Sequence, residues 1–181
     1  HSTTGTATIT NNVITGYQKT GILVDNTGSN ANITGNTITG DGPIDYIAEN
    51  GMQISRGATA TVSGNTVSGH SYTPNTNSSA GILLWEAGAT TISDNNLTEN
   101  ELGISFYDSS PVVISGNEIA ATSAGTGTTN FWGIWVSDAT TKAMTVDITG
   151  NAFTSNNSAG GTAIGAAAGF GPFAIDLNVN G

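Results

Sequence analysis

Residues 103–119 read GISFYDSSPVVISGNEI and contain one complete copy of a repeat that decides the fold. The repeat joins a short apolar phrase that begins with Gly to a second phrase centred on Asn. The apolar phrase occurs six times, as GILV at 21, GMQI at 51, GILL at 81, GISF at 103, GIWV at 133 and, less clearly, GTAI at 161. A repeat of 22 to 30 residues is typical of a solenoid, in which each coil buries its apolar face against its neighbours.

The second phrase also occurs six times, with its central residue at Asn12, Asn36, Asn65, Asn95, Asn117 and Asn151. Each of these residues follows an Asn, Gly or Asp, which are the types that tolerate the left-handed backbone of a tight corner. The residues on both sides alternate between apolar and polar, which is the period of a β-strand. We therefore predict that the six asparagines stack as a buried ladder at a corner between two strands.

These patterns predict an all-β fold, a single-stranded right-handed parallel β-helix of about six to seven coils with three short strands per coil. Equivalent strands of successive coils are expected to pair, so that equivalent residues form columns along a rod. Residues 1–181 are interpreted as one such domain of a larger secreted protein, so other domains of that parent protein are expected as partners.

The composition limits the partners of the protein. Three basic residues stand against 13 acidic ones, which gives a net charge of −10. No basic patch can form, and this argues against binding of nucleic acid. No apolar run is long enough to span a membrane, so no membrane span is expected. The chain has no cysteine, which excludes disulfides and cysteine-based zinc sites.

The spacing between the phrases shows where extra residues enter the solenoid. The chain from each Gly to the next Asn is nearly constant in length, whereas the chain from each Asn to the next Gly varies. The extra residues form inserts at 41–50, 70–80 and 121–132, all on one side of the rod. Because only a short connection at 98–102 separates the last two, they should flank a notch about 10 Å wide. Inserts confined to one side usually mark the binding side of a solenoid.

Aromatic residues are expected on the outer face of the strands at this notch. Aromatic side chains spaced by the repeat between coils suit stacking against the apolar CH faces of sugar rings. For Trp132, packing of an insert onto the rod is an equally good interpretation. We predict that a polysaccharide binds there, with contacts from Leu83, Trp85, Tyr107, Trp132, Trp135 and Glu101.

A column of charged residues follows these strands, with Arg56, Glu86, Asp108 and Asp138 at equivalent positions of successive coils. Neighbouring carboxylates about 5 Å apart would suit glycoside hydrolysis, with Glu86, Asp108 and Asp138 as catalytic residues. Glu86 and Asp108 also offer oxygen ligands for calcium, and calcium with Arg56 as base would suit a uronate lyase. The alternative is a solvated edge without catalytic role. The sequence therefore leaves open whether the protein is an enzyme, and calcium is the one cofactor considered.

Residues 103–119 resemble the repeat of right-handed parallel β-helix proteins of the pectin-lyase-like superfamily. The repeats are particularly similar to those of carbohydrate-binding and sugar-hydrolase solenoids, a group that includes the periplasmic NosD type. The similarity extends over residues 5 to about 165 and implies an extracellular (secreted) or cell-surface protein that binds or degrades polysaccharide.

The sequence departs from the motifs of the enzymes in this superfamily. The Asp-Asp pair and the Gly-His-Gly stretch of polygalacturonase-type hydrolases are absent, as is the Asp-Pro-His-Glu motif of alginate epimerases. The one internal histidine, His70, is interpreted as a loop residue. The resemblance therefore specifies the fold more closely than the activity.

A third function class follows from rows of outward Thr and Ser beside the core residues. Such rows on a solenoid suit ice binding, or they belong to a purely structural rod. Asn32, Val113, Glu118 and Asp147 interrupt the rows, and Thr is a favourable residue on any exposed strand. Ice binding is the less favoured alternative.

Overall fold

The computed structural model describes residues 5–73, 77–121, 131–137, 140–155, 161–167 and 174–180. These residues form three parallel sheets. Sheet A contains β1 (Gly5–Thr10), β4 (Ser29–Thr34), β7 (Thr59–Ser63), β10 (Thr90–Ser93), β13 (Val112–Ser115), β16 (Met144–Thr149) and β19 (Ile175–Asn180). Sheet B contains β2 (Val13–Thr15), β5 (Thr37–Ile44), β8 (Thr66–Tyr72), β11 (Asn96–Thr98), β14 (Glu118–Ala121) and β17 (Ala152–Ser155). Sheet C contains β3 (Thr20–Asp25), β6 (Asn50–Ser55), β9 (Ala80–Trp85), β12 (Leu102–Tyr107), β15 (Phe131–Ser137) and β18 (Gly161–Ala167).

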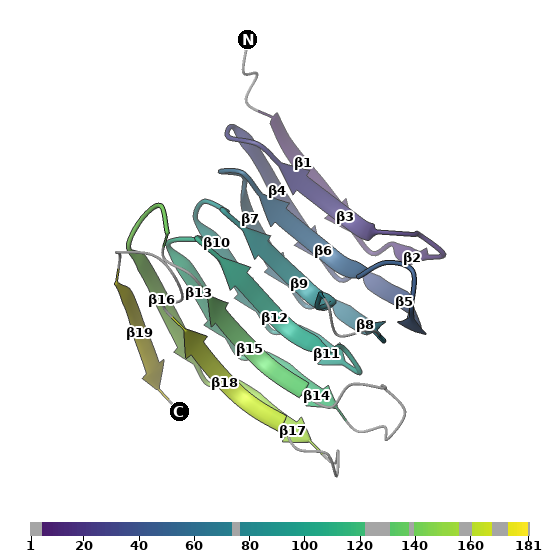
Figure 1. The fold of residues 1–181 in the computed structure, drawn as a ribbon. Helices are drawn as coiled ribbons and strands as arrows, with labels where there is room; N and C mark the ends of the chain where they lie inside the picture. The colour runs from purple at the N-terminus through teal and green to yellow at the C-terminus, as the bar shows by residue number, and fades with distance from the viewer. Residues whose placement is uncertain are drawn as a thin grey trace.

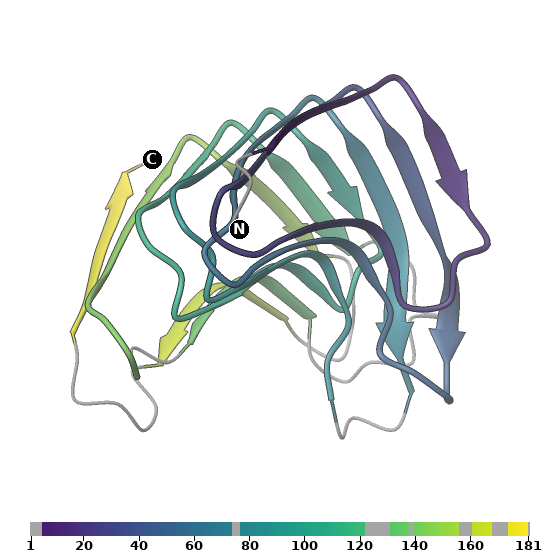
Figure 2. The same ribbon diagram turned by 90° about the horizontal axis from the view of Figure 1, so that it is seen from above.

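The chain visits the three sheets in turn, so each coil contributes one strand to each sheet and every strand pairs with its equivalents in the neighbouring coils. This confirms the predicted solenoid with three strands per coil. The coils lie one above another in Figure 1 and follow similar paths when seen from above in Figure 2. About four coils, from β4 to β15, have a neighbour on both sides. The predicted count of six to seven therefore overstates the fully enclosed part of the rod.

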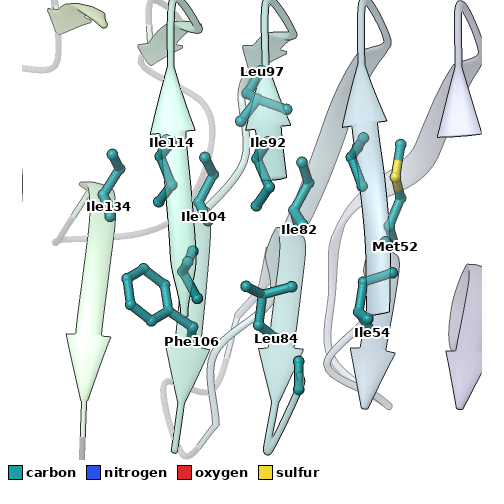
Figure 3. Close-up of a cluster of buried hydrophobic side chains, with 14 of the residues drawn as sticks. Met52, Ile54, Ile82, Leu84, Ile92, Leu97, Ile104, Phe106, Ile114 and Ile134 are labelled. Carbon is teal, nitrogen blue, oxygen red and sulfur yellow. The ribbon is translucent and has the colours of Figure 1, made fainter. Parts of the chain in front are cut away.

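Inward side chains of successive coils stack directly on one another. Ile22, Met52, Ile82, Ile104 and Ile134 occupy paired positions of sheet C, and Figure 3 shows four of them in one row. A second column of sheet C contains Val24, Ile54, Leu84, Phe106 and Val136. Sheets A and B add Ile33, Val62, Ile92 and Ile114, and Ile38, Val67, Leu97 and Ile119, all of which are buried. Burial of these aliphatic side chains drives the stacking of the coils.

One register differs from the prediction. Gly161 pairs with Phe131 and Ile164 pairs with Ile134, so that Ala163 and not Gly161 occupies the position of the leading glycine. The predicted alignment would have placed Thr162 in the inward column next to Ile134. The observed alignment instead places Ile164 next to Ile134 and sets Gly165 against Trp135, whose ring would lie 2.8 Å from a Cβ atom at that position.

The predicted asparagine ladder is present. At its centre, the backbone N–H and the side-chain Nδ2 of Asn65 both donate to Oδ1 of Asn95, each at 2.9 Å. Asn95 donates in the same way to Oδ1 of Asn117. The preceding residues Gly64 and Asp94 have φ values of 62° and 55°, as the tight corner requires. Side-chain bonds of the same kind link Asn12 to Asn36, Asn36 to Asn65, and Asn117 to Asn151.

Two of the predicted inserts begin as strand. β5 and β8 continue past the corner as far as Ile44 and Tyr72, with a register shift in β5 between Thr39 and Gly42. His70 therefore lies in a strand and is fully buried, in contrast to the predicted loop position. Its ring finds polar partners inside the rod, which is why a histidine is tolerated there. Most of the third insert, residues 122–130, lies outside the described residues.

Candidate functional site

A groove with a volume of about 590 Å³ lies on the outer face of sheet C. Residues of the sheet C strands form its floor: Ala80, Leu83, Trp85, Leu102, Ser105, Tyr107, Trp135 and Ser137. The walls come from the first two inserts and the segments next to them: Lys19, Tyr46, Ile47, Ala48, Asn50, Tyr72, Asn77 and Ser78. We call this the sheet C groove. It extends along the rod from the first coil to the fifth, about four strand spacings or roughly 19 Å.

Strand alternation directs the floor residues outward. In β9, Ile82 and Leu84 are fully buried, whereas Leu83 is half-buried and Trp85 is 43% exposed. In β12, Ile104 and Phe106 are buried and Tyr107 is half-buried. The predicted outward orientation of Leu83, Trp85, Tyr107 and Trp135 is thus confirmed, and all four line the groove.

Trp85 and Tyr107 form an aromatic stack. Their ring centroids are 4.4 Å apart and their planes differ by 6°. The sequence predicted outward aromatic residues spaced by the repeat between coils, and in this pair each ring covers one face of the other. The same outward column continues with Ser55 on one side of the pair and Ser137 on the other. Because both neighbours are small, the column places no other large side chain against the outer face of either ring.

Trp135 and Trp132 contact each other edge to face, with centroids 4.5 Å apart and planes at 63°. Trp135 lines the groove, whereas Trp132 is half-buried and does not. Gly165 of β18 makes room for both indoles, because a Cβ atom there would lie 2.5 Å from the Trp132 ring and 2.8 Å from the Trp135 ring. Trp132 therefore supports Trp135 from the side.

Glu101 does not line the groove, contrary to the prediction. It is only 6% exposed, and its Oε2 accepts hydrogen bonds from the backbone N–H groups of Tyr72 at 3.3 Å and Ser79 at 2.9 Å. Burial raises the pKa of Glu101, and these hydrogen bonds oppose that shift in part. The carboxylate thus holds both ends of the second insert and acts as a support for the groove wall.

Asp108 is also buried, and its carboxylate is fully engaged. Its Oδ1 accepts from the backbone N–H groups of Thr140 at 2.6 Å and Thr141 at 3.2 Å, and its Oδ2 accepts from the Thr140 hydroxyl. Burial acts to raise the pKa of Asp108, but the hydrogen bonds outweigh it and hold the pKa below its usual value. This placement gives Asp108 a structural role at a corner and does not support the predicted catalytic role.

The charged column keeps its backbone alignment but not a common direction of its side chains. The N–H of Arg56 donates to Trp85 O, and the N–H of Glu86 donates to Tyr107 O. The Arg56 guanidinium, however, forms an ion pair with Asp25, away from Asp108. Neither Arg56 nor half-buried Glu86 lines the groove.

The predicted calcium ligands are likewise not assembled into a site. Among the described residues, no three acidic or histidine side chains gather where they could hold a metal ion. The carboxylate of Asp108 already accepts hydrogen bonds at both oxygens, so its pairing with Glu86 as a calcium site is not supported. Asp138 lies outside the described residues.

The family of the chain follows from the architecture and the comparison with known proteins. The sequence model of a family described as a right-handed β-helix region matches residues 1–171. The chain belongs to the right-handed β-helix family. No curated protein and no solved structure gave a significant match. The part of this β-helix that the structure describes contains no helix that could cross a membrane.

Several groove residues of this β-helix were missed by the sequence analysis. Lys19, Tyr46, Tyr72, Asn77 and Ser78 line the groove but were not predicted as contacts. The predicted contacts came from the strands, the short connection and the third insert, and none came from the first two inserts. The available signal was a tyrosine in each of the first two inserts, one of which, Tyr46, is 59% exposed.

Proposed function

We propose that this β-helix is an extracellular polysaccharide-binding domain and that the sheet C groove receives the glycan chain. The observation that carries the proposal is the Trp85–Tyr107 stack, which lies in the floor of the sheet C groove. An exposed stacked aromatic pair in a groove is typical of a site that contacts an apolar surface of a ligand. Extracellular location and membership of a larger secreted protein are proposed from the resemblance of the repeats to those of carbohydrate-binding solenoids.

The groove offers both kinds of contact that a sugar chain requires. The outer faces of Trp85 and Tyr107 can cover the CH face of a pyranose ring. Hydroxyl and amide groups of Ser105, Ser137 and Asn77 lie among the lining residues and can bond to sugar hydroxyls. Since the groove follows the rod over several coils, it suits an extended chain.

Binding without catalysis is the form of the proposal that the side chains favour. Hydrolysis requires two carboxylates on either side of the glycosidic bond. Among the described residues, none of those that line the groove is Asp or Glu. The hydrolase and the calcium-dependent lyase suggested by the sequence therefore receive no support from the groove itself.

A binding screen with matched variants tests the proposed function. The retardation of the protein in gels that contain single polysaccharides would be measured for the wild type, Trp85→Ala and Tyr107→Ala. Val113→Ala is the control, because Val113 is similarly exposed at 36% but lies on sheet A. We expect the groove variants to lose at least about tenfold in affinity, about 1.4 kcal/mol, and the control to bind as the wild type does. Equal binding by all four proteins, or no binding to any polysaccharide, would refute the proposal.

The same polysaccharides separate a binding domain from an enzyme. After incubation with and without calcium, new reducing ends would reveal hydrolysis, and absorbance from unsaturated uronates would reveal elimination. We expect neither product. The appearance of either one in the wild type would show that the protein is an enzyme.

A further inference from the structure

The charges around the sheet C groove specify the chemical class of its ligand. We propose that the groove takes an uncharged polysaccharide and excludes chains that carry carboxylate or sulfate groups. This inference rests on the proposed function and narrows it to neutral glycans. Three observations support it. The lysine and arginine side chains already bind other groups of the protein, buried carboxylates lie behind the groove wall, and the described lining residues include no acidic side chain.

All three lysine and arginine side chains of the protein are engaged by the protein itself. Arg56 pairs with Asp25, and Nζ of Lys142 donates to Ala87 O at 3.2 Å. Lys19 is the one charged residue among those that line the groove, and its Nζ donates to Ala48 O in the first insert. Partial burial lowers the pKa of Lys19. Its ammonium group therefore links the start of β3 to the groove wall, and it is the one cation that the described lining residues present to a sugar carboxylate.

Two buried carboxylates lie directly behind the groove wall. Glu49 is 1% exposed and stands between Ala48 and Asn50, which both line the groove. Glu101 is 6% exposed and precedes Leu102, another lining residue. The chain as a whole carries a net charge of −10. A negatively charged chain would approach against this field, whereas a neutral chain would not experience it.

The lining also lacks the means to bind an anion through a metal ion. A bridging divalent cation requires several protein oxygen ligands, usually carboxylates. Among the described residues, no acidic side chain lines the groove and no cluster that could hold a metal is present. What the groove provides is aromatic rings, aliphatic side chains, hydroxyls and amides, which are the groups that pair with the CH faces and hydroxyls of neutral sugars.

Pairs of polysaccharides that share a backbone and differ in charge test this inference. Hydroxyethyl cellulose would be compared with carboxymethyl cellulose, and carboxyl-reduced polygalacturonate with polygalacturonate itself. In at least one pair, we expect the neutral member to bind and the charged member to bind at least about tenfold more weakly at about 20 mM salt. Raising the salt to about 500 mM should leave the affinity for the neutral member unchanged. It should reduce the difference in affinity between the two members, because salt screens the repulsion of the charged chain.

The outcomes distinguish this inference from the function on which it rests. In one outcome, the charged member binds more tightly than the neutral one, and salt and Trp85→Ala both weaken that binding. That result would refute the proposal of an uncharged ligand but would leave the proposed polysaccharide binding intact. Binding of neither member in any pair would count against both the proposed function and the inference.

A variant with an added cation provides a second test. Ser137→Lys places an ammonium group beside Tyr107 at the floor of the groove. If charge is what excludes anionic chains, the ratio of the affinity for the charged member to that for the neutral member should rise several-fold in this variant compared with the wild type. An unchanged ratio would show that charge does not determine the selectivity.

Discussion

The hydroxyl of Tyr17 lies 2.5 Å from Nε2 of His70, although the two residues are 53 positions apart and belong to the first and third coils. Gly40 of the intervening coil makes this contact possible. A Cβ atom on Gly40 would lie 2.8 Å from the His70 ring and 2.7 Å from Oε2 of Glu49. The absence of a side chain in the second coil thus lets a tyrosine reach across it.

The hydrogen bonds around His70 define its tautomer. Oδ1 of Asn100 accepts from the backbone N–H of His70 at 3.3 Å and lies 2.7 Å from its Nδ1. Because an amide oxygen only accepts, Nδ1 must carry the proton. Nε2 of the neutral ring then accepts a hydrogen bond from the Tyr17 hydroxyl. Burial lowers the pKa of His70 to about 4, with the Asn100 bond opposing the shift, and burial raises the pKa of Tyr17.

The buried histidine predicts that the fold loses stability in mild acid. The pKa of His70 is about 4 in the folded protein and 6.5 for an ordinary histidine, so the unfolded chain binds more protons between these values. The contribution of His70 to the free energy of unfolding should be complete above about pH 6.5 and fall by about 3 kcal/mol towards pH 4. Urea denaturation at a series of pH values measures this.

A His70→Asn variant isolates the effect, because Glu49 and Glu101 change the free energy of unfolding in the opposite direction. Their raised pKa values make the folded state bind protons more readily than the unfolded chain. The stability difference between the wild type and His70→Asn should therefore shrink as the pH falls from 6.5 to 4. A difference that does not change with pH would contradict the assignment.

Two asparagines at the same position of different repeats should differ strongly in their contribution to the free energy of unfolding. Asn95→Ala removes the acceptor of two buried donors of Asn65 and the donor to Val62 O. It should lower the free energy of unfolding by about 2–4 kcal/mol. Asn12→Ala, at the exposed end of the ladder, should cost less than about 1 kcal/mol. Chemical denaturation gives both values, and similar losses would mean that the buried ladder is not a main source of stability.

The leading glycine of each of the first five apolar phrases is required by close packing. A Cβ atom on Gly103 would lie 2.5 Å from the carbonyl oxygen of Gly133 and 2.6 Å from Cγ2 of Ile119. Gly103→Ala should therefore destabilise the fold by about 1–3 kcal/mol or more. Gly5→Ala is the matched control, because a Cβ atom there would meet no atom within 4 Å beyond its chain neighbours. The two melting temperatures test this, and an unchanged value for Gly103→Ala would refute the close-packing explanation.

Removal of the Glu101 carboxylate should loosen the backbone locally at the groove wall. In Glu101→Ala, the amides of Tyr72 and Ser79 lose their acceptor and should exchange with deuterium at least about tenfold faster. Glu101→Gln keeps an oxygen acceptor and should restore much of the protection. Amides of β13, in sheet A, provide the internal reference. Equal protection of the two amides in the wild type and Glu101→Ala would show that the carboxylate does not hold the insert.

The sequence predicted the parts of the structure that repeat and missed those that occur once. Alternation and spacing placed Ile104 inside, Trp85 outside and Asn95 in the ladder, because every coil repeats the same steric requirement. The repeat could not show that Asp108 turns towards Thr140 or that Glu101 turns towards the second insert. These orientations depend on local backbone partners that have no equivalent in other coils. The same limit explains the misplaced Gly161, because a weak repeat offered two alignments that both turn Ile164 towards the core, and alternation alone could not distinguish them.

The asparagine ladder also gives the rod an electrical direction. In each link, the residue nearer the N-terminus donates and the residue nearer the C-terminus accepts, from Asn12 to Asn151. The side-chain amide dipoles are therefore aligned along the axis, as peptide dipoles are in an α-helix. The unshared oxygen of Asn12 leaves partial negative charge at one end of the row, and the opposite end carries the partial positive charge. A rod assembled from uncharged corner residues is in this way polarised from end to end.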